Sequence, residues 1–154
     1  GKMGKVLGVL VLLAVMVGGI YFYLTGTSGA PAYQTYEKFA DHLLNNEFNK
    51  AEEYADGDAL NEVDRMDALH TNMMRSGMSN IVGDVLGVSR SIESERASAD
   101  GKSVEYRIKQ LVRRHQKGNA MGVTVTYMHD VTVEKDGKDW WVVDFQQEIK
   151  RKKR

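Results

Sequence analysis

The chain has 154 residues, of which 27 % are charged, with a formal net charge of zero and no cysteine. This length allows one domain and a short additional segment. The absence of cysteine excludes disulfides, zinc ribbons and thiol catalysis, and the balanced charge excludes a global field that would attract nucleic acid.

The first feature along the chain is an apolar segment, because no charged side chain occurs from residue 6 to residue 24. As a helix, such a segment would extend over roughly 28 Å, close to the hydrocarbon thickness of a bilayer. Aromatic side chains near its downstream end are typical of the headgroup level. We therefore predict a transmembrane anchor over residues 1–25. The residues expected to contact lipid are Val6, Leu10, Leu13, Val17, Tyr21 and Tyr23.

Two alternatives compete with a retained anchor. Lys2 and Lys5 resemble the basic start of a secretory signal, and Ala30-Pro31-Ala32 resembles its cleavage site. The apolar run exceeds the length of an ordinary signal core, and a buried globular helix would need a larger domain to cover it. We interpret the segment as an anchor. The two lysines then place the N-terminus in the cytoplasm and the rest of the chain in the periplasm or outside, as in a single-pass protein of the bacterial inner membrane.

Small residues within this segment recur at four-residue spacing, at Gly4 and Gly8 and again at Ala14 and Gly18. Such spacing lets two membrane helices approach closely, so these positions are candidates for helix packing. Small residues are also common in spans that do not pack.

Residues 26–32 are rich in Gly, Ser and Thr and contain the single proline, which predicts a flexible linker. Three helical patterns follow, the last of them running from Asp58 to about Met78. Their apolar positions are Tyr36, Phe39, Ala40, Leu43 and Leu44, then Phe48, Ala51, Tyr54 and Ala55, then Leu60, Val63, Met66, Leu69, Met73 and Met74.

The apolar period then changes to two, which predicts four strands over residues 88–95, 104–109, 123–133 and 141–149. In the last of them, Trp141, Val143 and Phe145 are expected to share one face. Turns are expected at Asp100-Gly101, at Lys117-Gly118-Asn119 and at Asp136-Gly137. Helices followed by strands predict an α+β domain over residues 33–149, with two or three helices packed on a curved antiparallel sheet of about four strands.

Two passages of this domain carry a resemblance to a known family. The opening YEKFADHLLNNEFNKAEEYA and the closing VTVEKDGKDWWVVDFQ are similar to segments of the nuclear transport factor 2-like (cystatin-like) superfamily. The resemblance implies a cone-shaped fold with a hollow, and anchored members include an inner-membrane scaffold component of bacterial type IV secretion systems. Because the superfamily hosts many activities, the resemblance implies a fold rather than a reaction.

No catalytic motif is present, and the four histidines form no metal-binding pair. We therefore assign no catalytic residue, metal or cofactor. Tyr106, Tyr127 and His129 are expected on the concave face of the sheet, where they would line a tentative ligand pocket. The alternative is that they are hydrogen-bonded core groups.

Met66, His70, Met73 and Met74 share one helical face, a ligand set that could suit Cu(I). We prefer the interpretation that these methionines fill the gap between helix and sheet.

The chain ends in a basic tail over residues 150–154, which could bind anionic lipid or an acidic partner, or remain solvated. Nucleic acid is not expected, because aromatic residues are not interleaved with the basic ones. The tail consists of Lys150, Arg151, Lys152, Lys153 and Arg154.

Taken together, these patterns predict a membrane-anchored extracytoplasmic scaffold or accessory subunit of a membrane-associated assembly. Its expected partners are membrane lipid and other proteins, or further copies of itself. The alternatives are a module that binds a small ligand on the concave sheet face and a filament subunit with a helix-packed core. An enzyme is not expected.

Overall fold

The computed structural model describes residues 29–77 and 83–150. The predicted anchor, the small residues within it and residues 151–154 of the basic tail lie outside this part of the chain. Among the described residues, no helix is both long enough and apolar enough to cross a membrane.

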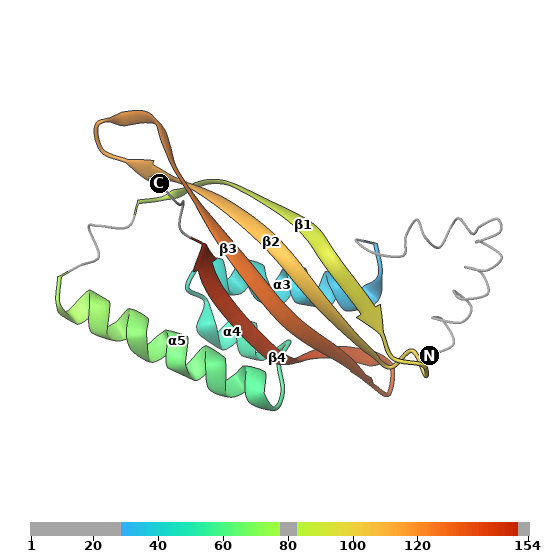
Figure 1. Cartoon of the computed structure of the whole chain (residues 1–154). Coiled ribbons are helices and arrows are strands. Elements are labelled where there is room, and N and C mark those ends of the chain that lie inside the picture. Colours follow the sequence, from blue (N-terminus) through green and yellow to red (C-terminus); the bar gives the residue numbers. More distant parts are fainter. Residues whose placement is uncertain (1–28, 78–82, 151–154) are drawn as a thin grey trace.

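The described chain forms helices first and an antiparallel sheet second, which confirms the predicted α+β class (Figure 1). The helices pack on an open sheet of four strands in the order β1-β2-β3-β4. The elements are α3 (Pro31–Leu44), α4 (Phe48–Glu52), α5 (Asp58–Arg75), β1 (Val85–Ala97), β2 (Ser103–Gln116), β3 (Asn119–Asp136) and β4 (Asp139–Lys150).

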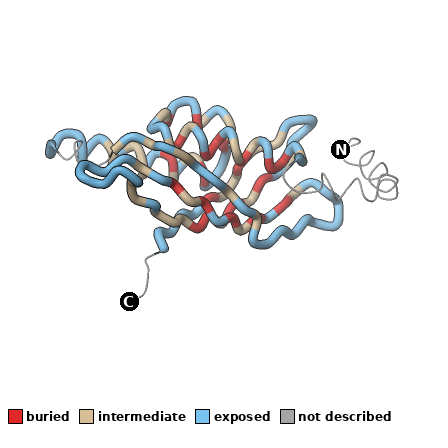
Figure 2. Tube along the Cα trace, turned by 90° about the horizontal axis from the view of Figure 1, so that it is seen from above, coloured by how far each residue is buried: buried red, intermediate tan, exposed pale blue. Residues whose placement is uncertain are grey.

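Helix α3 begins at Pro31, inside the segment predicted as a linker. Proline is favourable at this position because its fixed φ angle suits the first helical turn and its missing N–H is not needed there. The apolar spacing predicted for this helix is correct, since Tyr36 and Phe39 are fully buried beneath it. Figure 2 shows buried segments concentrated in the middle of the domain.

At its other boundary the domain extends slightly further than predicted. Lys150 still pairs with Thr126 of β3, so the first residue of the predicted tail belongs to strand β4.

Strand β4 departs from the alternation expected of it. Trp141, Val143 and Phe145 were predicted to share a face, but the structure buries Val142 together with Phe145. The reason is a one-residue register shift between β3 and β4, which leaves Val143 in a bulge and reverses the alternation before it. Val142 also forms an isolated parallel bridge with Ala55, which ties the loop before α5 to the free edge of the sheet.

Helix α5 is only half covered. Its first turns bury Ala59 and Val63, but farther along Leu69 is 50 % exposed, Met73 38 % and Met74 51 %. The prediction that Met73 and Met74 fill a gap between helix and sheet is therefore wrong. The apolar residues of α5 continue along the helix beyond the part that the rest of the domain covers.

Two glycines of the β2–β3 hairpin provide a test of its close packing. Both have positive φ angles, but a Cβ on Gly122 would lie 2.6 Å from the carbonyl oxygen of Arg114, whereas a Cβ on Gly118 would have nothing within 4 Å. Gly118→Ala is expected to cost roughly 1–2 kcal/mol from backbone strain. Gly122→Ala is expected to cost at least about 1 kcal/mol more, because the strands must also separate. Thermal unfolding followed by tryptophan fluorescence would compare them, and equal Tm values would contradict this close approach.

Candidate functional site

The sheet has one end near the start of α3 and one end remote from it. The ring of Tyr33, in the first turn of α3, lies 5.5 Å from the ring of Tyr106 near the start of β2. We call this the proximal end. The opposite end, which we call the distal end, holds the start of β1, the β2–β3 hairpin, the end of β4 and the second half of α5 (Figure 1).

The exposed large hydrophobic residues of the described chain all lie toward this distal end. They come from four different elements, α5, β1, β3 and β4. These residues are Leu69, Met73, Met74, Leu86, Val88, Met121 and Ile149. Single exposed apolar residues are normal on a protein surface, but their concentration at one end indicates an interaction surface.

A buried hydrogen-bonded group lies between α3 and the inner face of the sheet. The Tyr36 hydroxyl lies 2.6 Å from Nδ1 of His129, and Nε2 of His129 lies 2.8 Å from Oε1 of Gln147. A neutral imidazole satisfies both contacts if Nε2–H donates to Gln147 and Nδ1 accepts from Tyr36. Burial lowers the pKa of His129 to about 4, and the positive charge of Arg90 acts in the same direction. Burial also raises the pKa of Tyr36, so its hydroxyl remains a donor.

Arg90 joins three elements within the same layer. Its side chain is only 7 % exposed, and Nη1 lies 2.8 Å from a carboxylate oxygen of Asp41 on α3. Its Nε donates to Oε1 of Gln110 on β2 at 2.7 Å, and the guanidinium carbon lies 5.7 Å from the centre of the Tyr36 ring. Within the described residues its buried Nη2 has no hydrogen-bond partner. This arrangement fixes α3 on the sheet.

The three residues of the predicted ligand pocket lie on the inner face of the sheet, as their alternation predicts. Tyr106 is 3 % exposed and His129 is 2 % exposed, and α3 covers both, since the rings of Tyr33 and Tyr36 pack against them at 5.5 and 5.8 Å. Tyr127 lies farther toward the distal end and is half-buried, paired with Gln110 of β2. Their role in ligand binding stays a prediction.

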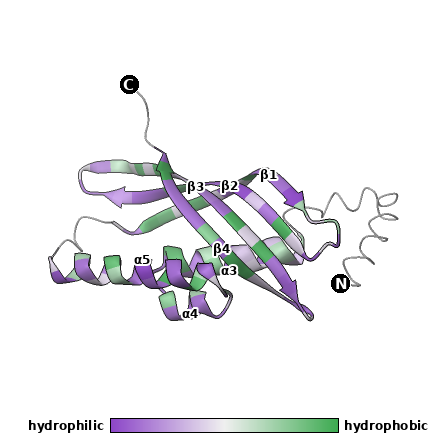
Figure 3. Ribbon diagram, turned by 60° about the horizontal axis from the view of Figure 1, so that its bottom comes forward, coloured by the Kyte–Doolittle hydropathy of each residue, from purple (hydrophilic) through white to green (hydrophobic). Residues whose placement is uncertain are grey.

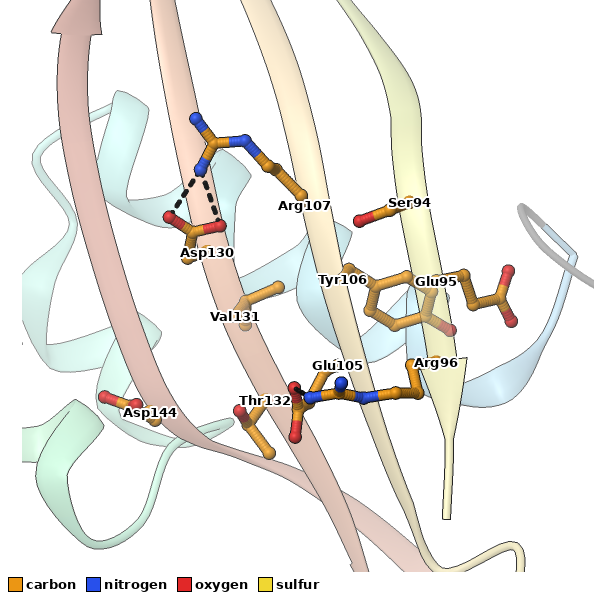
Figure 4. A pocket seen from close by; sticks show the side chains of 10 residues that line it. All are labelled: Ser94, Glu95, Arg96, Glu105, Tyr106, Arg107, Asp130, Val131, Thr132 and Asp144. Carbon is orange, nitrogen blue, oxygen red and sulfur yellow. Dashed lines mark hydrogen bonds and ion pairs between the residues drawn. The ribbon is translucent and has the colours of Figure 1, made fainter. Parts of the chain in front are cut away.

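The outer face of the sheet carries a depression of about 540 Å³. Figure 4 shows two pairs of opposite charge across neighbouring strands, while Glu95 and Asp144 stand apart from them. Arg107 donates to both carboxylate oxygens of Asp130, at 2.8 and 2.7 Å, and Arg96 pairs with Glu105. Exposed pairs of this kind contribute little stability and compensate each other's charge. In the described part of the chain, no group of three or more His, Asp or Glu side chains could hold a metal ion.

Arg90, Gln110 and Gln147 are not among the site residues predicted from the sequence. A signal for the first two exists, because Arg90 lies between Val88 and Ile92 in the strand alternation. Gln110 lies in the same way between Ile108 and Val112. A polar residue in that phase predicts a buried partner for it.

Comparisons with known proteins add no assignment. No family model matches the chain, and no match is found among curated proteins or among solved structures.

Proposed function

We propose that this chain is a membrane-anchored scaffold or accessory subunit of a protein assembly, with its α+β domain on the extracytoplasmic side of a bacterial inner membrane. The observation that carries the proposal is the concentration of exposed large hydrophobic residues at the distal end. A surface of this composition suits protein contacts, whereas the paired charges of the outer sheet face do not.

The position of α3 supports this orientation. Its first residue, Pro31, follows the predicted anchor after only residues 26–30, a tether that reaches at most about 18 Å when fully extended. The proximal end would therefore stay close to the membrane. The distal end would project away from the bilayer, where partner proteins could reach it.

Membership of the nuclear transport factor 2-like superfamily is part of the same proposal. Helices that precede an antiparallel sheet and cover one of its faces support it. Under α3, His129 and Arg90 form hydrogen bonds and an ion pair that join the helix to the sheet. Such contacts suit a scaffold better than an enzyme.

The anchor is tested by extraction of bacterial membranes that contain the full chain. The full chain is expected to remain in the membrane pellet after washing with alkaline carbonate and to be released by detergent. A variant that lacks residues 6–24 is expected to be soluble. Release of the full chain by carbonate alone would contradict the anchor.

The interaction surface is tested by a photo-crosslinking amino acid placed at Met121, which is 79 % exposed in the distal hairpin. Lys138, exposed in the β3–β4 turn at the proximal end, is the matched control position. Discrete crosslinked species are expected from position 121 and not from position 138. The same species from both positions, or from neither, would argue against a distal protein contact.

A further inference from the structure

The neutral net charge of this chain conceals two surfaces of opposite sign. Residues 47–67, which form α4 and most of α5, contain only two basic residues, Lys50 and Arg65. Their acidic residues are Glu47, Glu52, Glu53, Asp56, Asp58, Glu62, Asp64 and Asp67. Residues 106–129, which form most of β2 and the first half of β3, contain no aspartate or glutamate. Their basic residues are Arg107, Lys109, Arg113, Arg114 and Lys117.

The acidic residues form a crowded group where α4 meets α5. A hydrogen bond to Asp64 raises the pKa of Glu52, and the charge of Asp67 adds to the effect. Carboxylates this close repel one another, so an external cation would be stabilising there. The next turns of α5 expose apolar side chains. We call this combination the acidic helical surface, made of Glu52, Asp64, Asp67 and Met74, whereas Leu69 and Met73 lie on the other flank of α5.

The distal strand ends carry the opposite combination. Arg113, Lys117 and Lys150 are exposed, and no ion pair within residues 29–77 and 83–150 includes any of them. Exposed apolar residues lie among them. We call this combination the basic sheet end, made of Arg113, Lys117, Lys150, Leu86, Met121 and Ile149.

The two surfaces lie on different sides of the molecule. Figures 1 and 3 both show α5 along one side and the β2–β3 hairpin along the opposite side. The hairpin of one copy therefore cannot fold onto its own α5, but it can meet the α5 of a neighbour. Each surface combines apolar residues with an excess of one charge sign, although Asp84 and Glu148 lie at the basic sheet end and Arg65 and Arg75 lie on α5. An apolar centre with a rim of complementary net charge is what such an interface requires.

We propose that the basic sheet end of one copy docks on the acidic helical surface of a second copy. The contact joins two different surfaces, so it repeats from copy to copy and gives either a closed ring or an open row. The inference rests on the proposed function in one respect, because anchoring in a common membrane would hold neighbouring copies side by side at the same height. Anionic lipid is the less suitable occupant, since the basic sheet end lies at the opposite end of the domain from Pro31, where the anchor would join.

Paired charge reversals in the full chain, purified in lipid nanodiscs or mild detergent, test the contact. One variant is Arg113→Glu with Lys117→Glu, and the other is Asp64→Lys with Asp67→Lys. The unmodified chain is expected to self-associate in a manner that weakens with salt, and each variant is expected to associate about tenfold or more weakly. An equimolar mixture of the two variants is expected to associate again, because each variant keeps one native surface and these two surfaces have opposite charge. The two altered surfaces also have opposite charge, with both signs reversed.

The matched control is Lys102→Glu with Lys138→Glu, which makes the same change of charge at exposed positions of the proximal end. This variant is expected to associate as the unmodified chain does. Association that falls equally in the control, or that does not return in the mixture, would overturn the proposal. An unmodified chain that stays monomeric at every concentration tested would also overturn it.

Lipid binding is tested separately with the same proteins in nanodiscs of phosphatidylcholine, mixed with vesicles of phosphatidylglycerol. No capture by the vesicles is expected. Capture that disappears in the Arg113→Glu, Lys117→Glu variant would assign the basic sheet end to lipid and reject the second copy as its occupant. Carbonate extraction is independent of both results, so a failure of the anchor and a failure of self-association can be told apart.

Discussion

Asp41→Asn is expected to lower the free energy of unfolding by about 2 kcal/mol, a large effect for a side chain that is 60 % exposed. The cause lies in its partner, because the Arg90 side chain is only 7 % exposed and cannot turn to water. Without the negative charge, the buried cation keeps only neutral acceptors, the new amide oxygen at position 41 and Oε1 of Gln110. Breaking a fully buried ion pair costs roughly 3–5 kcal/mol, and the value here is smaller because water reaches Asp41.

Replacing Arg90 and Gln110 together is expected to lower the free energy of unfolding less than Asp41→Asn does. In the double variant Arg90→Met, Gln110→Leu, the buried charge and its buried acceptor both disappear, and apolar side chains of similar volume take their places. Chemical denaturation followed by tryptophan fluorescence would compare it with Asp41→Asn. A double variant that loses as much stability as Asp41→Asn would show that the Arg90 contacts stabilise the fold in themselves.

Much of this fold could be predicted from the sequence because local signals agree with the final structure. Residues 123–133 alternate except at Met128, which is apolar and buried in the polar phase. Asp-Gly pairs stand at positions 100–101 and 136–137, where the chain turns between strands. Turn residues of this kind tolerate the positive φ angles found at Gly101 and Gly137. Boundaries were less exact, since a helix can begin at a proline that also suits a linker.

The features that could not be predicted depend on what lies opposite a residue. The bulge at Val143 lies where β4 pairs with β3 on one edge and Val142 bridges to Ala55 on the other, and neither partner can be read from the sequence of β4 alone. The apolar stripe of α5 has the same spacing whether or not a sheet covers it. The exposure of Leu69, Met73 and Met74 therefore became visible only with the tertiary structure.

The candidate interaction surface has the same origin. Leu86, Met121 and Ile149 are far apart in the sequence, and only the antiparallel order of the strands brings the start of β1, the hairpin and the end of β4 to one end. The distribution of charge depends on the fold in the same way. The net charge is zero, but the acidic residues gather on α4 and α5 and the basic residues gather on the β2–β3 hairpin.

Acidification from about pH 6.5 to about pH 4 is expected to remove up to roughly 3 kcal/mol of stability through His129 alone. The pKa of His129 is lowered to about 4 in the folded protein, chiefly by burial, whereas in the unfolded chain it is near 6.5. As the pH falls through this window, the unfolded chain binds a proton that the folded protein does not bind. Stability is therefore complete above the upper value and decreases by about 1.4 kcal/mol for each pH unit below it.

Other titratable groups of the domain also contribute to the pH dependence of stability. Glu37 and Glu95 have pKa values raised by burial, and they act on stability in the opposite direction. The pKa of Glu47 is lowered by its hydrogen bond to His42, and this group acts in the same direction as His129 but at lower pH.

Thermal unfolding of the full chain in detergent, followed by tryptophan fluorescence, would be measured at several pH values in this range. His129→Gln is expected to lower Tm at neutral pH and to flatten its pH dependence, while His115→Gln, at an exposed position, is expected to leave the dependence unchanged. An unaltered slope in His129→Gln would contradict a buried neutral imidazole. Protonation makes Nδ1 a donor, so the Tyr36 hydroxyl must accept this hydrogen bond and its own proton loses its acceptor, close to the Arg90 cation. Helix α3 is therefore the element expected to separate from the sheet first.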